Sequence, residues 1–154
     1  MKVVIIMGSK SDMDWSEKIA STLKELGIES VMRIASAHKV PLKALDIIEE
    51  YKDEKVVYIT VAGRSNALSG FVDAQTDKPV IACPPYSSKF AGADIFSSLR
   101  MPSGVCPMVV IGTEQAGLAA AKMLGLTDED LQKRIKDYQE ENKKQIDKDD
   151  KEVK

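Results

Sequence analysis

The chain has 154 residues, of which 44% are hydrophobic, a composition that suits one compact domain with a substantial core. Its formal net charge is −2, and the last 28 residues hold 10 acids and 8 bases, so residues 1–126 are electrically balanced. Without a basic stripe, the chain is a poor match for a nucleic-acid strand or duplex. The first ten residues contain an apolar run of only five, too short for a secretion signal or a membrane span, so we expect a cytoplasmic protein with no membrane partner.

The first half of the chain alternates between strand and helix patterns. Val3–Met7 is a continuous apolar run that ends at Gly8, which is typical of a strand buried on both faces. A helix is then predicted by apolar residues at helical spacing, namely Trp15, Ile19, Leu23 and Leu26. Residues 30–34 predict the second strand, Pro41 the start of the second helix, and residues 55–62 the third and clearest strand.

The second half continues this alternation. The pattern predicts a short helix at 68–75, a strand at 79–83 that stops at Pro84 and Pro85, a helix at 90–100, a strand at 105–111 and a helix at 114–124. Thr127 is suited to cap a last helix from about residue 128 to about residue 147. The charged residues at the end of that helix predict a solvated tail that frays.

This order of elements predicts a three-layer α/β fold, in which a five-stranded parallel sheet carries helices on both faces. Five strands suit the flavodoxin-like order 2-1-3-4-5, where ligands bind beyond the carboxyl ends of the neighbouring strands 2, 1 and 3. We expect one α/β domain over residues 1–126, followed by a C-terminal helix and charged tail over residues 127–154. The loops at 8–12, 36–41 and 63–69 then converge at one edge of the sheet.

The first of these loops, GSKSD, is open to two interpretations. Gly8 permits a tight turn, and free backbone amides with the hydroxyls of Ser9 and Ser11 at a helix start favour an anion. Asp12 would repel a phosphate, but its carboxylate would accept hydrogen bonds from a sugar diol or an amine. The alternative is that Ser11 or Asp12 only caps the helix. The loop matches neither the Walker nor the Rossmann pattern.

The second loop, ASAHKVP, contains the only histidine of the chain. Histidine is the side chain that carries or releases a proton near neutral pH without special tuning. His38 follows a predicted strand at its carboxyl end, which makes it a candidate acid or base, and the alternative is an ordinary surface or capping residue. Lys39 adds a fixed positive charge that suits a phosphate group.

The third loop, AGRSNALSG, combines a flexible backbone with several donors. Gly63 allows the backbone to approach a ligand closely, and Arg64, Ser65 and Asn66 supply hydrogen-bond donors. The alternative is an ordinary turn in which Asn66 caps a helix. A catalytic triad built from a loop serine and His38 is disfavoured, because the chain has no GxSxG motif.

The two cysteines give no sign of a metal site. Cys83 and Cys106 lack CxxC spacing, and one histidine cannot complete a typical zinc site with them. We therefore expect two buried thiols and no metal.

Five motifs in chain order, MGSKSD, SAHKVP, AGRSN, CPP and SSLRMPSG, resemble those of the aminoimidazole ribonucleotide carboxylase family of purine biosynthesis. The resemblance covers about residues 3–126. One class of that family, the N5-carboxyaminoimidazole ribonucleotide mutases, has a second histidine in a glycine-rich third loop and an arginine after the first histidine. This chain has Lys39 in that place and no second histidine, so it is more similar to the animal-like class II, which adds carbon dioxide directly. Ala67 and Ser69–Gln75 differ from the animal form.

The resemblance also implies roles for individual residues. It implies that His38 transfers a proton, that Ser9 and Lys39 hold the phosphate of aminoimidazole ribonucleotide, and that Asp12 holds its ribose. The wider set of implied substrate contacts comprises Gly8, Ser11, Ser36, Ala37, Gly63, Arg64, Ser65, Asn66 and Leu68. The chemistry implied needs no metal, biotin or ATP, and the octamers known in the family imply a homo-oligomer, with a tetramer as the smaller alternative.

Other functions remain as alternatives at this point. The first is the mutase reaction, and the second is a non-catalytic phosphosugar-binding module of the same fold. A phosphoacceptor receiver domain is disfavoured because the third predicted strand ends at Ala62-Gly63-Arg64 and not at an aspartate. A flavin carrier is disfavoured because the three loops contain no aromatic ring to stack on the cofactor.

Overall fold

The computed structural model describes residues 1–153 and contains the predicted parallel sheet. Its strand order is β2-β1-β3-β4-β5. The strands are β1 (Lys2–Met7), β2 (Glu29–Ile34), β3 (Val56–Val61), β4 (Val80–Ala82) and β5 (Met108–Val109). The register places Met7 beside Ile34 on one side and Val61 on the other, so the loops that follow these three strands leave the sheet side by side.

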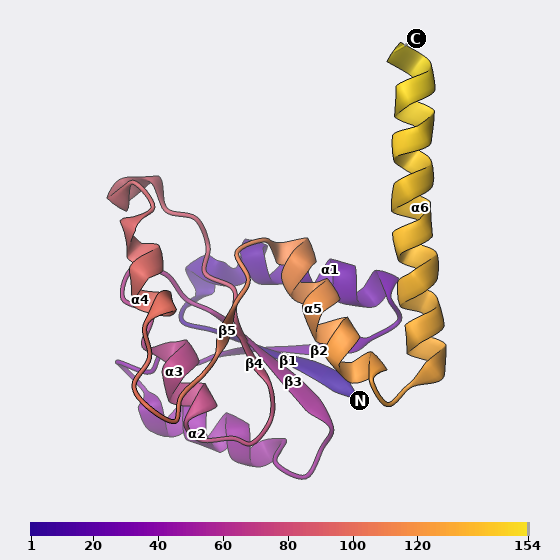
Figure 1. The fold of residues 1–154 in the computed structure, drawn as a ribbon. Helices are drawn as coiled ribbons and strands as arrows, with labels where there is room; N and C mark the ends of the chain where they lie inside the picture. Colours follow the sequence, from indigo (N-terminus) through magenta and orange to yellow (C-terminus); the bar gives the residue numbers. More distant parts are fainter. Residues whose placement is uncertain (154) are drawn as a thin grey trace.

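Helices cover both faces of the sheet, which gives the predicted three layers (Figure 1). One face carries α1 (Met13–Glu25) and α5 (Thr113–Gly125), and the other carries α2 (Pro41–Glu50) and α3 (Leu68–Asp73). The chain then continues into the C-terminal helix α6 (Glu129–Val153). Pro41 is the first residue of α2, as predicted, because its fixed φ and missing N–H are tolerated there.

Two hydrophobic cores lie on the two sides of the sheet because successive side chains of a strand point to opposite faces. Val3 and Ile5 pack with α1 and α5, whereas Val4 and Ile6 pack with α2 and α3. All six residues of β3 are buried. The unbroken apolar strand runs that predicted a covered parallel sheet are therefore explained by packing on both faces.

The segment between β4 and β5 differs from its prediction. In place of one helix at 90–100, the chain forms two short 3₁₀ turns at Ser88–Phe90 and Ala93–Ile95, followed by the single-turn helix α4 (Phe96–Leu99). The break falls at Ala91 and Gly92, whose φ values of 49° and 77° are left-handed and end a right-handed helix. The last strand is also shorter than the predicted 105–111.

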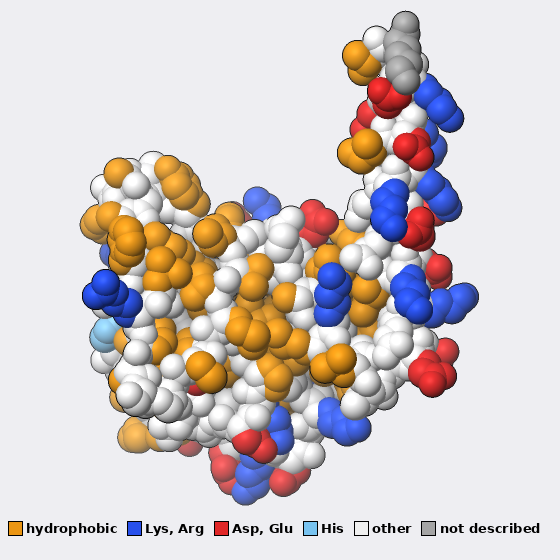
Figure 2. All heavy atoms as spheres, in the orientation of Figure 1, with side chains coloured by type: hydrophobic (Ala, Val, Ile, Leu, Met, Phe, Trp, Pro, Cys, Tyr) orange, Lys and Arg blue, Asp and Glu red, His pale blue; other side chains and the backbone are white. Residues whose placement is uncertain are grey.

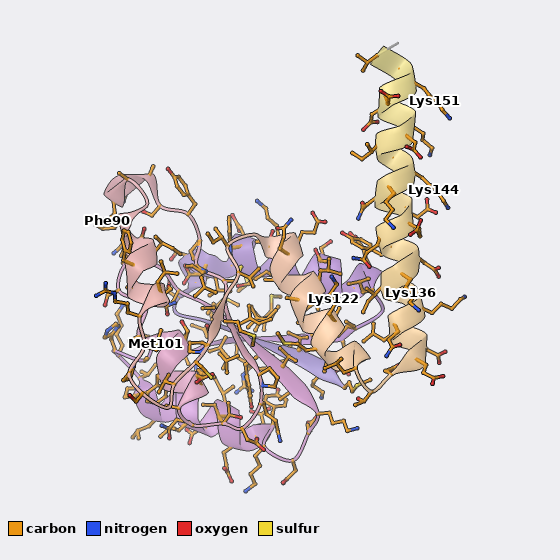
Figure 3. All side chains as sticks on the ribbon, in the orientation of Figure 1. Phe90, Met101, Lys122, Lys136, Lys144 and Lys151 are labelled. Carbon is orange, nitrogen blue, oxygen red and sulfur yellow. The ribbon has the colours of Figure 1, made fainter. Side chains whose placement is uncertain are left out.

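The C-terminal helix is longer than predicted and stands away from the rest of the molecule (Figure 1). Its first turns are fastened by Leu131 and Ile135, which are buried in the core beside α5. Asp128, and not Thr127, caps the helix, since the Leu131 N–H donates to Asp128 Oδ1 at 2.8 Å. Lysines such as Lys144 and Lys151 lie along the projecting part (Figure 3), where Lys144 pairs with Glu141 three residues earlier. Such pairs stabilise an exposed helix by a small amount each, and the helix extends to Val153.

The two cysteines have different environments. Cys83 is buried as predicted, and burial raises the pKa of its thiol to about 11. The prediction for Cys106 is wrong: it is exposed, because the stretch before β5 forms a surface loop anchored by a 2.7 Å hydrogen bond from the Cys106 N–H to Asp73 Oδ2. Among residues 1–153, no helix has the length and apolar character needed to span a membrane.

Candidate active site

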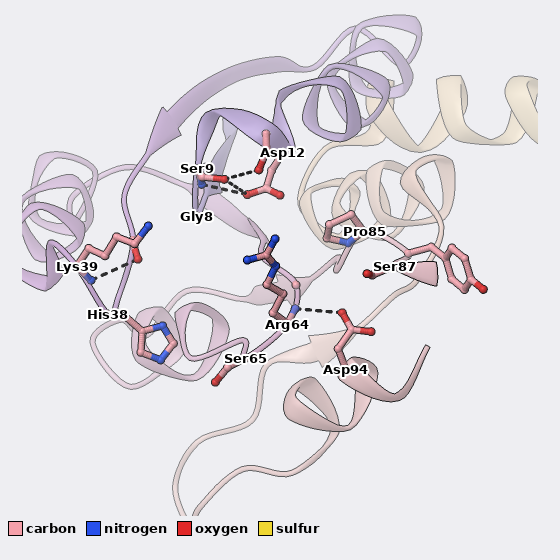
Figure 4. Close-up of a pocket in the computed structure, with 14 residues that line it drawn as sticks. Gly8, Ser9, Asp12, His38, Lys39, Arg64, Ser65, Pro85, Ser87 and Asp94 are labelled. Atoms are coloured by element: carbon pink, nitrogen blue, oxygen red, sulfur yellow. Dashed lines mark hydrogen bonds between the residues drawn. The ribbon is translucent and has the colours of Figure 1, made fainter. Parts of the chain in front are cut away.

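A pocket of about 440 Å³ lies where the loops after β1, β2 and β3 meet (Figure 4). Most of the residues predicted to form a site line this pocket: Gly8, Ser9, Ser11, Asp12, Ser36, His38, Lys39, Gly63, Arg64 and Ser65. Their convergence follows from the strand order, since β1 lies between β2 and β3. The loops that are richest in polar residues therefore form one polar cavity at the predicted edge of the sheet.

The first loop is organised around the Asp12 carboxylate. Asp12 Oδ2 accepts hydrogen bonds from the Ser9 N–H at 3.0 Å and from the Ser9 hydroxyl at 3.1 Å. The Ser9 and Ser11 hydroxyl oxygens are 2.6 Å apart. The Ser9 amide is therefore bonded within the loop and is not one of the amides free for an anion. The alternative, in which Asp12 only caps the helix, is not found for α1, because the Asp12 side chain makes no capping hydrogen bond to that helix. The carboxylate instead bonds to Ser9 within the loop.

Asp12 is half-buried, and its environment is unfavourable for a negative charge. Burial raises the pKa of its carboxyl above the ordinary value, while the two hydrogen bonds from Ser9 and the nearby Arg64 cation lower it less. The carboxylate thus faces a pocket that does not fully compensate its charge. A ligand hydroxyl or amine that donates a hydrogen bond to Asp12 would supply part of that compensation.

The second loop presents His38 and Lys39 at the rim of the pocket, and both are exposed. Ser36 shapes this turn, since its hydroxyl accepts the Lys39 N–H at 3.3 Å and its carbonyl accepts the Val40 N–H at 2.9 Å. The turn ends where α2 begins at Pro41. The imidazole and the ammonium group are therefore held on a short turn between two fixed elements of the fold.

The third loop contains the unusual backbone of the site. Arg64, which follows Gly63, has a left-handed φ of 61°. The Arg64 N–H donates to Asp94 Oδ2 at 3.0 Å. The Arg64 side chain extends from this loop toward Asp12 on the opposite side of the pocket (Figure 4). The Arg64 guanidinium group, from the loop after β3, thus faces the Asp12 carboxylate, from the loop after β1.

Three of the predicted site residues lie outside the pocket lining. Leu68 is the first residue of α3 and is buried in the core. Asn66 is buried as well, and its side chain joins the loop to neighbouring elements: its amide donates to Ser98 Oγ at 2.9 Å, and its oxygen accepts the Ser69 N–H at 3.3 Å. Ala37 packs against the core that contains α2. These three residues support the loops and do not face the cavity.

A fourth side of the pocket is formed by residues that were not predicted to belong to a site. It consists of Pro85, Tyr86 and Ser87 after β4, together with Asp94. The Pro84-Pro85 pair was interpreted as the end of a strand and as part of a family motif but was given no place in the site, and Asp94 lies inside a stretch that was predicted to be helical. The neighbouring position of β4 and β3 in the sheet was the available signal, because the loop after β4 must then leave beside the loop after β3.

The assembled pocket offers one imidazole, two cations, the two carboxylates of Asp12 and Asp94, and several hydroxyls. His38 is the chain's only imidazole, Lys39 and Arg64 carry the positive charge, and Ser9, Ser11 and Ser65 supply hydroxyl groups. Residues 1–153 contain no cluster of three or more His, Cys, Asp or Glu side chains arranged to hold a metal ion. The lining suits a polar small molecule that carries both an anionic group, for the cations, and hydrogen-bond donors, for the carboxylates.

Comparison with known proteins agrees with this arrangement. Residues 2–145 match the family model for AIR carboxylase. The phosphoribosylaminoimidazole carboxylase of Archaeoglobus fulgidus is 63% identical over 153 residues, which cover 99% of this chain and 85% of the relative. The enzyme of the same name from Treponema denticola is 51% identical over 154 residues, which cover 99% and 97% of the two chains.

A third relative has a different name. The N5-carboxyaminoimidazole ribonucleotide mutase of Methanocaldococcus jannaschii is 39% identical over 148 residues, which cover 94% of this chain and 92% of the relative. Among solved structures, the crystal structure of Treponema denticola PurE superposes with a TM-score of 0.95, at 51% identity and with 99% and 98% of the two chains covered. The chain therefore belongs to the AIR carboxylase family, an enzyme family of purine biosynthesis.

Proposed function

We propose that this enzyme is a 5-aminoimidazole ribonucleotide carboxylase that adds free carbon dioxide to carbon 4 of its substrate, forming 4-carboxyaminoimidazole ribonucleotide. The observation that carries this proposal is the single imidazole in a pocket that also contains Lys39 and Arg64, in a chain with no second histidine. The two more similar relatives described above are both named carboxylases. The reaction proposed is cytoplasmic and uses no metal, biotin or ATP.

The proposed chemistry needs one proton carrier. Carbon 4 of the enamine-like ring attacks the carbon of carbon dioxide, and the electron pair of the broken C–O π bond moves onto an oxygen to give a carboxylate. His38 then takes the proton from carbon 4, which restores the aromatic ring, and passes it to solvent. A well-placed acid or base of this kind contributes roughly 10²–10⁴-fold to the rate.

The proposed binding mode divides the pocket into two ends. Ser9 and Lys39 hold the phosphate, and the Asp12 carboxylate accepts hydrogen bonds from the ribose hydroxyls. Arg64 and Ser65 line the end where the ring reacts. This division places the negative phosphate beside the Lys39 cation and the neutral diol beside Asp12. Because the Ser9 hydroxyl donates to Asp12 Oδ2 at 3.1 Å, it has to turn from the carboxylate to the phosphate when the substrate binds.

The alternative reactions make different demands on the pocket. A mutase must release the carboxyl group from the exocyclic nitrogen, protonate the departing amine and retain the carbon dioxide, and the resemblance associates this work with a second histidine. A pure phosphosugar-binding module would need the cations but no proton carrier. The two experiments that follow separate these alternatives from the proposal.

Replacing His38 tests the proton transfer. His38→Asn preserves much of the side-chain volume and its hydrogen bonding but removes the titratable group, so we expect turnover to fall at least ~100-fold with substrate affinity little changed. Steady-state carboxylation assays together with calorimetric binding measure both quantities. Near-normal carboxylation by the variant would remove His38 from the mechanism, and an absence of turnover in the unmodified protein would favour the binding module.

The carbon source distinguishes carboxylase from mutase. Stopped-flow assays can begin with either carbon dioxide or bicarbonate, before the two equilibrate. We expect immediate carboxylation from carbon dioxide, a lag from bicarbonate, and little conversion of N5-carboxyaminoimidazole ribonucleotide, because the pocket has no second histidine to protonate the departing amine. Efficient turnover of the N5-carboxylated compound would assign the mutase reaction and leave the family membership intact.

Replacing Asp12 should separate stability from affinity. Because the pKa of Asp12 is raised in the folded protein, the folded state binds a proton at this carboxyl more readily than the unfolded state does. The contribution of Asp12 to the free energy of unfolding is therefore present below its unfolded-state pKa and is lost as the pH rises through its folded-state pKa. Asp12→Asn should therefore raise the Tm near pH 7, have less effect near pH 3, and weaken ribonucleotide binding. Thermal unfolding at both pH values and calorimetry check this. A lower Tm near pH 7 would show that the carboxylate stabilises the loop.

We also propose that the enzyme is a homo-oligomer, an octamer or a tetramer. The support is an apolar face formed by the exposed side chains Tyr86, Phe90, Phe96, Leu99, Met108 and Ile111. Side chains of this kind gather over α4 and β5 in Figure 2, and Phe90 lies near the tip of the segment in Figure 3. A group of neighbouring exposed apolar side chains is typical of a surface where protein molecules associate. Sedimentation should give a multiple of four subunits, and a fully active monomer would contradict the proposal.

A further inference from the structure

The backbone of Arg64 is in a conformation that an arginine does not readily adopt. Among the non-glycine residues of the described chain, only Arg64 and Ala91 have a positive φ. A left-handed backbone brings Cβ of an L-residue too close to the following carbonyl, so the surrounding structure must hold it in place. Arg64 lines the pocket, and its conformation sets the direction in which its guanidinium group extends.

Side chains from a distant segment contact this peptide on both sides. The Asp94 carboxylate accepts the Arg64 N–H at 3.0 Å. The Ser97 hydroxyl lies 2.7 Å from the Asp94 carbonyl oxygen and 3.2 Å from the Arg64 carbonyl oxygen, so its one proton is directed mainly to Asp94. The Ser97 oxygen also accepts the N–H of Asn66 at 3.0 Å. Both polar groups of the Arg64 backbone are thus contacted by the stretch from 94 to 97, thirty residues further along the chain.

The guanidinium group itself makes no hydrogen bond within residues 1–153. It faces Asp12 across the pocket, where its charge acts on the Asp12 carboxyl without direct contact (Figure 4). The arrangement is therefore asymmetric, since the Arg64 N–H is bound by Asp94 while the Arg64 cation remains available to a ligand. Charge-assisted hydrogen bonds to such a cation are the strong ones in binding sites.

We propose that Asp94 is a positioning residue that fixes Arg64 in its left-handed conformation and so directs its guanidinium group to the carboxylate that forms on carbon 4 of the substrate. This role rests on the proposed function for the identity of that substrate. Asp94 contributes through the Arg64 backbone, and its own negative charge would by itself repel an anion. Removing it therefore has opposite expected effects under the two explanations: loss of positioning weakens binding, whereas loss of repulsion strengthens it.

Three variants separate these effects. Asp94→Ala removes both the acceptor and the charge, and we expect affinity for 4-carboxyaminoimidazole ribonucleotide to fall at least ~10-fold, the scale of one charge-assisted contact. Asp94→Asn keeps an oxygen to accept the Arg64 N–H, and binding should stay near that of the unmodified enzyme. Asp73→Ala is the matched control, because Asp73 also anchors a loop through a backbone N–H, that of Cys106, but lies outside the pocket lining. This control should bind normally.

A double-variant cycle and hydrogen exchange complete the test. With Arg64→Ala already present, Asp94→Ala should cause no further loss of affinity, because no guanidinium group remains to be positioned. Amide exchange at Arg64 should be faster in Asp94→Ala and unchanged in Asp94→Asn, a measurement that needs no substrate. Unchanged or tighter ribonucleotide binding by Asp94→Ala, or an equal loss in Asp73→Ala, would overturn the positioning role. If the unmodified protein fails to bind the ribonucleotide, the proposed function fails as well, and the exchange data still report whether Asp94 fixes the loop.

Discussion

The parallel pairing of β1 with β2 on one side and β3 on the other is the constraint on which the rest of the structure depends. It sets Met7 beside Ile34 and Val61, so that the loops after β1, β2 and β3 all leave from the same edge of the sheet. The same pairing buries both faces of the central strands beneath helices. A slip of one residue would exchange the two faces of a strand and move the loops relative to one another. The pocket and the two cores are therefore fixed by a single register.

Much of the fold was predictable because its signals are local. The apolar run of β3, the proline that opens α2 and the polar loops after the strands can each be identified within a few residues. The fourth side of the pocket was not predictable in this way, since the contact between Asp94 and Arg64 joins residues thirty apart and depends on how β3 and β4 pair. Local patterns also misassigned the stretch around Gly92, where a left-handed turn interrupts a sequence that otherwise favours helix.

The pocket combines features that each oppose folding. The Asp12 carboxylate is half-buried with a raised pKa, and Arg64 has a left-handed backbone. Neither feature is explained by packing of the core, which lies beneath the loops. Groups held in unfavourable states are common where a protein must receive a ligand, because the ligand supplies the interactions that the folded chain alone lacks. The sheet, buried on both faces, provides the stability that allows such loops to persist.

The stretch from Tyr86 to Leu99 belongs to two surfaces at once. Its exposed aromatic side chains, among them Phe90 and Phe96, point outward on the apolar face, while Asp94 in the same stretch holds the backbone of Arg64. Few regular hydrogen bonds stabilise these short turns, so a neighbouring molecule that covers the aromatic rings would also restrict the movement of Asp94. By mass action, the fraction of subunits with an ordered Arg64 would then rise with enzyme concentration, and the specific activity would fall on dilution.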